Sequence, residues 1–81
     1  MNQFTGVIKS GEEILHFSFS RVYTTEGEKY FVTSYRNGNF SHFDMKKDSK
    51  GIWRASQLSP SWVKDFEERL SKIIEENIAP A

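Results

Sequence analysis

The fold is decided by residues 29–47, which read KYFVTSYRNGNFSHFDMKK. Asn37-Gly38, in the middle of this stretch, is typical of a two-residue hairpin turn of type I′, because both central residues of that turn need a positive φ. The flanking residues are rich in β-branched and aromatic side chains, which favour strands. We therefore expect two antiparallel strands, over residues 29–36 and 39–47, with Arg36 opposite Asn39.

This turn fixes the register and divides the hairpin side chains between the two faces of a sheet. One face carries the stronger core candidates, which pair Tyr30 with Met45, Val32 with Phe43, and Ser34 with Ser41. The other face is mixed and pairs Phe31 with Asp44, Thr33 with His42, and Tyr35 with Phe40. A preceding strand would add His16, Ser18 and Ser20 to the mixed face. We expect the first face to form the core and the mixed face to lie outside.

Three further strands are expected from alternating apolar and polar residues bounded by turn residues. They cover Phe4–Lys9, Ile14–Tyr23 and Ile52–Ala55, the last being a short fifth strand or an extension of the fourth. Glycine occurs in each intervening turn, at Gly11, Gly27 and Gly51. The strands therefore occupy about residues 3–56 and form an antiparallel β-meander of four to five strands.

A single C-terminal helix is expected over about residues 60–78. Ser59 is a suitable N-cap, and Pro60 suits the first helical position, where a missing N–H is harmless. Apolar residues recur with helical spacing from Trp62 to Ile78 and predict a helix packed on one face of the sheet. Residues 1–81 are thus expected to form one α+β domain.

The apolar arc of this helix spans about 160°, which is wider than one side of a small sheet covers. Exposed apolar patches of this kind are often buried by a symmetric copy of the same chain. We therefore expect a homodimer through the later helical positions, Leu70, Ile73, Ile74 and Ile78.

Composition excludes several classes of protein. Eleven basic and eleven acidic residues give a net charge of +0, which argues against a strongly basic nucleic-acid tail. The absence of cysteine excludes disulfides and thiolate metal sites. We find no apolar run long enough to cross a membrane and no signal peptide, and expect a cytoplasmic protein without a membrane partner.

Enzymatic motifs are also missing from the sequence. The glycines are spaced like turns, and neither a nucleotide-binding loop nor a nucleophile elbow occurs. His16, His42 and Asp44 share the mixed face, but the two histidines lie on strands separated by a third, about 10 Å apart. We expect no enzyme, no cofactor and no metal site.

The mixed face is the strongest candidate for a binding site. Flat aromatic side chains on a sheet, beside basic residues, are how single-stranded nucleic acids are held by stacking. Residues 29–58 carry six basic and two acidic residues, a net +4. The expected ligand-binding residues are Phe31, Tyr35, Arg36, Phe40, His42 and Lys46, with Lys47 and Arg54 at the margin. The alternative is a protein-interaction or assembly module whose aromatic face is an interface without nucleic acid.

Leu58-Ser59-Pro60-Ser61-Trp62, followed by apolar residues at Phe66, Leu70 and Ile73, resembles the helix entrance of the single-stranded-DNA-binding transcriptional coactivator family. The resemblance covers roughly residues 30–78. It implies a strand meander with one helix, dimerisation through that helix, and a basic and aromatic sheet that holds single strands. The sequence also looks like small bacterial proteins that share the short motif D-x-x-G-x-W, formed here by Asp48, Gly51 and Trp53.

Overall fold

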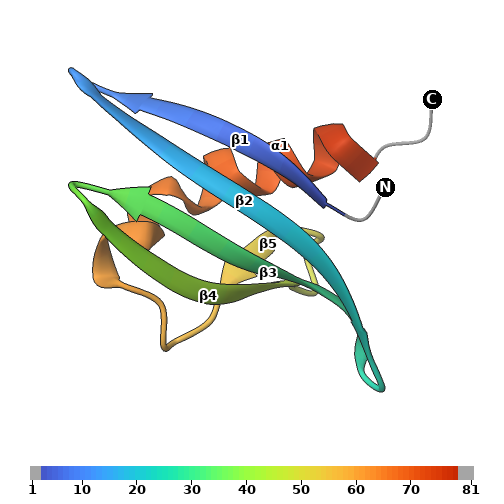
Figure 1. Ribbon diagram of the computed structural model, residues 1–81. Coiled ribbons are helices and arrows are strands. Elements are labelled where there is room, and N and C mark those ends of the chain that lie inside the picture. Colours follow the sequence, from blue (N-terminus) through green and yellow to red (C-terminus); the bar gives the residue numbers. More distant parts are fainter. Residues whose placement is uncertain (1–2, 79–81) are drawn as a thin grey trace.

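The computed structural model describes residues 3–78 and has the expected α+β architecture (Figure 1). Five antiparallel strands form one sheet in chain order. They are β1 (Gln3–Ser10), β2 (Glu13–Thr24), β3 (Gly27–Arg36), β4 (Asn39–Lys47) and β5 (Trp53–Ala55). A 3-10 helix, η1 (Ser61–Phe66), and an α-helix, α1 (Glu67–Ile78), follow the sheet.

The register expected from the Asn37-Gly38 turn is confirmed. Both turn residues have positive φ, 52° for Asn37 and 79° for Gly38. Arg36 lies opposite Asn39, and the paired positions continue unbroken to Tyr30 and Met45. The side of the sheet that faces the helix, here called the inner face, carries the buried hydrophobic strand residues, which are Ile8, Leu15, Phe17, Phe19, Tyr30, Val32, Phe43, Met45 and Trp53.

The sheet curls around the helix. α1 packs against both β1 and β5, although these strands are the two opposite edges of the sheet. Figure 1 shows α1 running along the inner side close to β1. The buried helical side chains, Val63, Phe66, Leu70 and Ile74, complete one core with the inner face. No helix within residues 3–78 is long and apolar enough to span a membrane.

The helix begins differently from the expectation. Ser59 is not an N-cap: its hydroxyl donates to the Ser56 carbonyl at 2.6 Å, which holds the preceding turn. Pro60 has φ −56° and ψ 144°, so it is extended and precedes the helix instead of starting it. The first six helical residues, Ser61–Phe66, are wound as a 3-10 helix, and α-helical geometry starts at Glu67.

The expected dimer contacts also need correction. Leu70 and Ile74 are fully buried within one chain, so neither is available on the surface for a second copy. Ile73 and Ile78 are half-buried and pack against the core from its margin. The apolar arc appeared too wide for one sheet because the periodicity of a helix does not show how far a sheet curls around it.

Candidate binding face on the outer side of the sheet

The outer face is the side of the sheet that points away from the helix. Alternation along each strand and the observed registers define its members. They are Gln3, Thr5, Val7, Lys9, Ile14, His16, Ser18, Ser20, Val22, Lys29, Phe31, Thr33, Tyr35, Phe40, His42, Asp44, Lys46 and Arg54. The expected mixed face of the hairpin is therefore part of a continuous surface across all five strands.

Three aromatic side chains of this face are exposed, as the register predicts. The exposed fractions are 41% for Phe31, 44% for Tyr35 and 68% for Phe40. Phe31 stacks on His42 with ring centroids 5.6 Å apart and planes 8° from parallel. Tyr35 and Phe40 are cross-strand partners with ring centroids 4.9 Å apart. The rings form two pairs on β3 and β4 that are open to a ligand.

A shallow pocket of about 510 Å³ lies beside the Tyr35–Phe40 pair, over β2 and β3. The pocket is lined by rings and small polar side chains, namely His16, Ser18, Thr33, Tyr35 and Phe40, and by Ser34, whose hydroxyl is buried on the inner side. Thr33 Oγ1 lies 3.1 Å from His42 Nδ1, and this hydrogen bond fixes the orientation of the imidazole on the sheet. The pocket can therefore accept a planar group that stacks on one side and forms hydrogen bonds on the other.

The outer face also has exposed apolar residues that the expected site did not include. Val7 and Ile14 are more than half exposed and continue the aromatic surface toward β1. Val22 lies at the opposite end of β2. Alternation along β2 predicts that Ile14 and Val22 share the face of His16. The face on which Val7 lies depends on the register between β1 and β2, and the sequence between these strands has no turn signal as specific as Asn37-Gly38.

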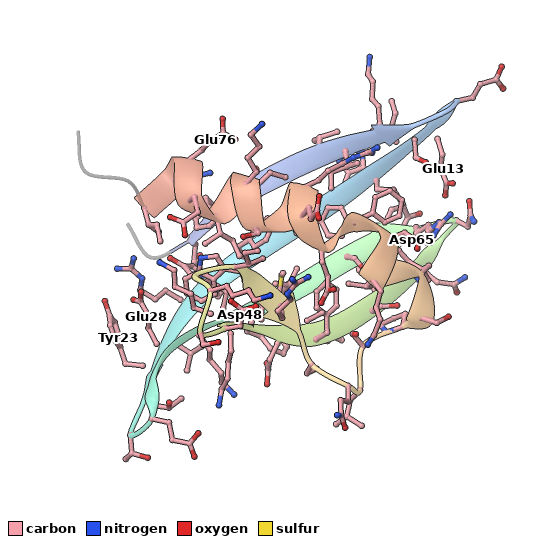
Figure 2. All side chains as sticks on the ribbon, turned by 180° about the vertical axis from the view of Figure 1, so that it is seen from behind. Glu13, Tyr23, Glu28, Asp48, Asp65 and Glu76 are labelled. Carbon is pink, nitrogen blue, oxygen red and sulfur yellow. The ribbon has the colours of Figure 1, made fainter. Side chains whose placement is uncertain are left out.

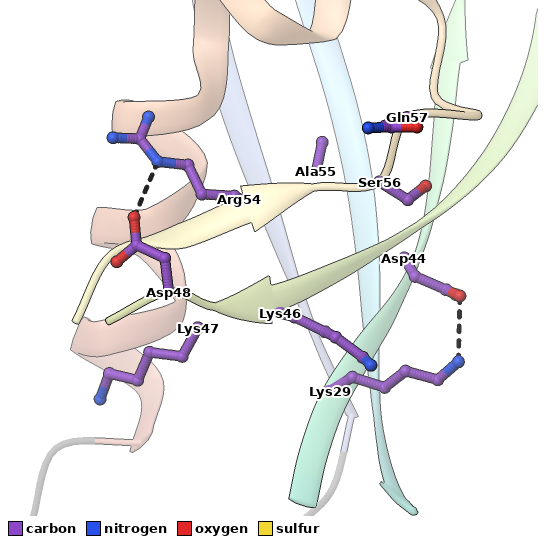
Figure 3. Close-up of a pocket in the computed structure, with 9 residues that line it drawn as sticks. All are labelled: Lys29, Asp44, Lys46, Lys47, Asp48, Arg54, Ala55, Ser56 and Gln57. Carbon is purple, nitrogen blue, oxygen red and sulfur yellow. Dashed lines mark hydrogen bonds and ion pairs between the residues drawn. The ribbon is translucent and has the colours of Figure 1, made fainter. Parts of the chain in front are cut away.

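The basic end of the outer face lies beyond Phe31. Lys46 is opposite Arg54, and Lys29 occupies the corresponding position on β3, so three cations form one row across the sheet. Lys29 was not among the expected binding residues, although the same hairpin register places it opposite Lys46. All three cations line an open pocket of about 460 Å³. Figure 3 shows Lys29 and Lys46 beside each other and the Arg54 side chain turned toward Asp48.

Each cation of this row is paired with a carboxylate. Lys29 Nζ lies 3.0 Å from Asp44, and Arg54 Nε lies 3.2 Å from Asp48 (Figure 3). Lys46 Nζ lies 3.2 Å from Glu26 in the β2–β3 turn. A phosphate group would have to compete with these carboxylates, so the positive potential of the row is partly neutralised.

Arg36 does not belong to the outer face, contrary to the expectation. Its position in β3 alternates with Tyr35, so its side chain leaves the sheet on the inner side. The guanidinium lies 4.7 Å from the centre of the Trp62 ring and forms two hydrogen bonds with Glu13, at 2.7 and 3.1 Å. These bonds raise the pKa of Arg36 and lower that of Glu13. Figure 2 shows Glu13 and Asp65 together at this end of the molecule.

Lys47, expected at the margin of the site, also lies on the inner side. Its amino group is 3.3 Å from Glu75 and 5.7 Å from the centre of the Trp53 ring. It therefore joins the end of β4 to α1 and is turned away from the aromatic surface. Within residues 3–78, no three metal-ligating side chains converge.

No family model, curated protein or solved structure matches this chain. The outer face itself, with two aromatic pairs, a polar groove and a row of paired cations, is therefore the basis for a functional assignment.

Proposed function

We propose that this protein is a small non-enzymatic binding module that holds single-stranded nucleic acid on its outer face. The observation that carries the proposal is the exposure of Phe31, Tyr35 and Phe40 on the side of the sheet opposite the core. Base stacking on such rings is tolerant of sequence, because every base has a flat face. The proposal assigns no cofactor or catalytic group and retains a cytoplasmic location and a homodimer.

The spacing of the side chains suits an extended single strand. Alternate residues of a strand lie about 6.8 Å apart. Along the hairpin, the paired rings of Tyr35 and Phe40 come first, His42 lies one such interval farther from the Asn37-Gly38 turn, and Phe31 lies one interval beyond His42. The cations Lys29 and Lys46 stand one interval beyond Phe31. A strand whose bases stack on the rings would bring its phosphates to this basic end.

Alanine substitution of the three rings tests this proposal. Binding of a fluorescently labelled, mixed-sequence oligonucleotide is measured by anisotropy at low salt. Phe31→Ala, Tyr35→Ala and Phe40→Ala should each weaken binding by about 1–3 kcal/mol, because each removes a stacking surface. Leu58→Ala is the matched control, since Leu58 is 94% exposed and belongs to the loop between β5 and η1, not to a strand. Equal affinities of all four variants and the unsubstituted chain would exclude stacking on the outer face.

A second function, docking of an apolar protein surface, is favoured by one specific observation. The three cations of the basic row, Lys29, Lys46 and Arg54, are all ion-paired. The apolar residues Val7 and Ile14 extend the aromatic surface. Salt separates the two functions. Affinity based on phosphate contacts falls steeply as salt rises, whereas apolar docking does not.

A further inference from the structure

The two edges of the sheet differ in how their backbone groups are satisfied. β5, at one edge, is covered by side chains of α1. Ser71 Oγ accepts the N–H of Trp53 at 3.0 Å, and a carboxylate oxygen of Glu67 accepts the N–H of Ala55 at 2.7 Å. Both outward-pointing amides of this three-residue strand are therefore satisfied within the chain.

β1, at the other edge, has no comparable cover. Successive residues of a strand point their backbone groups alternately to its two sides. Arg69 reaches the carbonyl of Lys9 at 3.4 Å from outside the sheet, which identifies the outward-pointing residues as Gln3, Thr5, Val7 and Lys9. Within residues 3–78, the backbone groups of Thr5 and Val7 on this side have no hydrogen-bond partner.

The sequence of β1 also lacks the features that protect edge strands. Its eight residues, QFTGVIKS, contain no proline and one charged side chain, Lys9. The register with β2 continues from Gln3 to Ser10 without a bulge. Prolines, charges and bulges are the usual means by which soluble proteins prevent pairing at an open edge. This edge is therefore long and regular enough to accept another strand.

We propose that β1 pairs antiparallel with β1 of a second copy of this chain, across a two-fold axis at Gly6. In this register Thr5 of each copy lies opposite Val7 of the other, and Gln3 lies opposite Lys9. The pairing repeats itself under two-fold rotation, as a closed symmetric dimer requires. Lys9 faces the neutral Gln3, so no like charges meet along the strand.

The helix beside β1 supports a second copy as the occupant of the edge. A Cβ at Gly6 would lie 3.0 Å from two side-chain carbons of Ile73, so Ile73 packs directly on the strand at the two-fold axis. Ile73 and Ile78 are also the two members of the sequence-predicted dimer interface that remain partly exposed. Pairing of the two β1 strands brings the copies of Ile73 together and adds apolar burial to the main-chain hydrogen bonds. This dimer does not depend on what the outer face binds.

Sedimentation of the full chain tests the dimer. The expected mass is about 19 kDa, twice the 9.4 kDa of one chain. Val7→Pro removes an outward N–H and leaves the hydrogen bonds to β2 intact, a position where edge strands tolerate proline. This variant should sediment at 9.4 kDa with an unchanged circular dichroism spectrum. Val7→Thr keeps the N–H and the β-branched shape, and as the matched control it should remain dimeric.

Amide hydrogen exchange of the unsubstituted chain provides a second test that needs no variant. The amides of Thr5 and Val7 should be protected, and their protection should decrease on dilution as the dimer dissociates. A 9.4 kDa species at every concentration, with rapid exchange at both amides, overturns the proposal. A dimer in which Thr5 and Val7 exchange rapidly also overturns it, because the interface must then lie elsewhere.

Discussion

Within residues 3–78, the buried polar side chains are Ser34 and Ser71, and only one of them has a hydrogen-bond partner. Ser71 Oγ accepts the backbone N–H of Trp53 and so connects α1 to the edge strand β5. The Ser34 hydroxyl is buried against the inner face and has no hydrogen-bond partner within residues 3–78. A buried polar group stabilises a fold when it is paired and costs desolvation free energy when it is not.

Alanine at these two serines should therefore have unequal effects on the free energy of unfolding. Ser71→Ala leaves the Trp53 amide without an acceptor and should cost about 1–3 kcal/mol. Ser34→Ala removes an unsatisfied group and should be neutral or slightly stabilising. Urea unfolding of both variants measures the difference. An equal loss of stability in the two variants would contradict this account of the core.

Two carboxylates have a lowered pKa because of specific hydrogen bonds. The pKa of Glu13 is lowered by the guanidinium of Arg36. The pKa of Asp48 is lowered first by the backbone N–H of Ile52 and then by Arg54. A lowered pKa in the folded state means that the charged carboxylate contributes stability above the pKa of the unfolded chain. That contribution is lost as the pH falls through the folded value.

We therefore expect the free energy of unfolding to decline as the pH falls below about 4. Glu13→Gln and Asp48→Asn should each be less stable than the unsubstituted chain at neutral pH and should show a shallower decline in acid. Glu12→Gln, at an exposed position in the neighbouring turn, is the control and should keep the full decline. Urea unfolding between neutral and acidic pH measures these slopes, and parallel curves for all variants would contradict the assignment.

At the scale of elements, the β3–β4 hairpin depends on its turn. Gly38 has a φ of +79°, a conformation that costs a residue with a Cβ about 1–2 kcal/mol. Gly38→Ala should lower the free energy of unfolding by this amount, and Gly38→Asn should lower it less, since asparagine tolerates positive φ. Thermal unfolding of the two variants provides the comparison. A Gly38→Ala variant as stable as the original would show that the positive φ at residue 38 does not limit the stability of the hairpin.

The sequence predicts this hairpin well because one dipeptide determines its turn, register and faces together. The exposure of Phe31, Tyr35 and Phe40 follows from that register alone. Arg36 is the member of the expected site that is wrong, because it alternates with Tyr35 along β3 and therefore lies on the inner side. The burial of Leu70 and the open edge of β1 could not be predicted, since both depend on how far the sheet curls around α1.

At the scale of the whole molecule, stability and binding are assigned to opposite sides of one sheet. The inner face and the helix form the core, whereas the outer face contributes few buried contacts. Phe17→Ala should therefore cost about 3–5 kcal/mol of stability. Tyr35→Ala and Phe40→Ala, which remove an exposed cross-strand pair, should each cost less than about 1 kcal/mol. Urea unfolding tests this division, and similar losses on both faces would contradict it.

Binding of single strands on the outer face is tested most directly by a two-dimensional NMR titration with a short mixed-sequence oligonucleotide at low salt. Signals of Phe31, Tyr35, Phe40 and His42 should shift together, while those of the buried helical residues Leu70 and Ile74 should not. Added salt should reverse the shifts, because phosphate contacts weaken as salt rises. Unchanged signals of the four outer-face residues at millimolar oligonucleotide would contradict the proposed function.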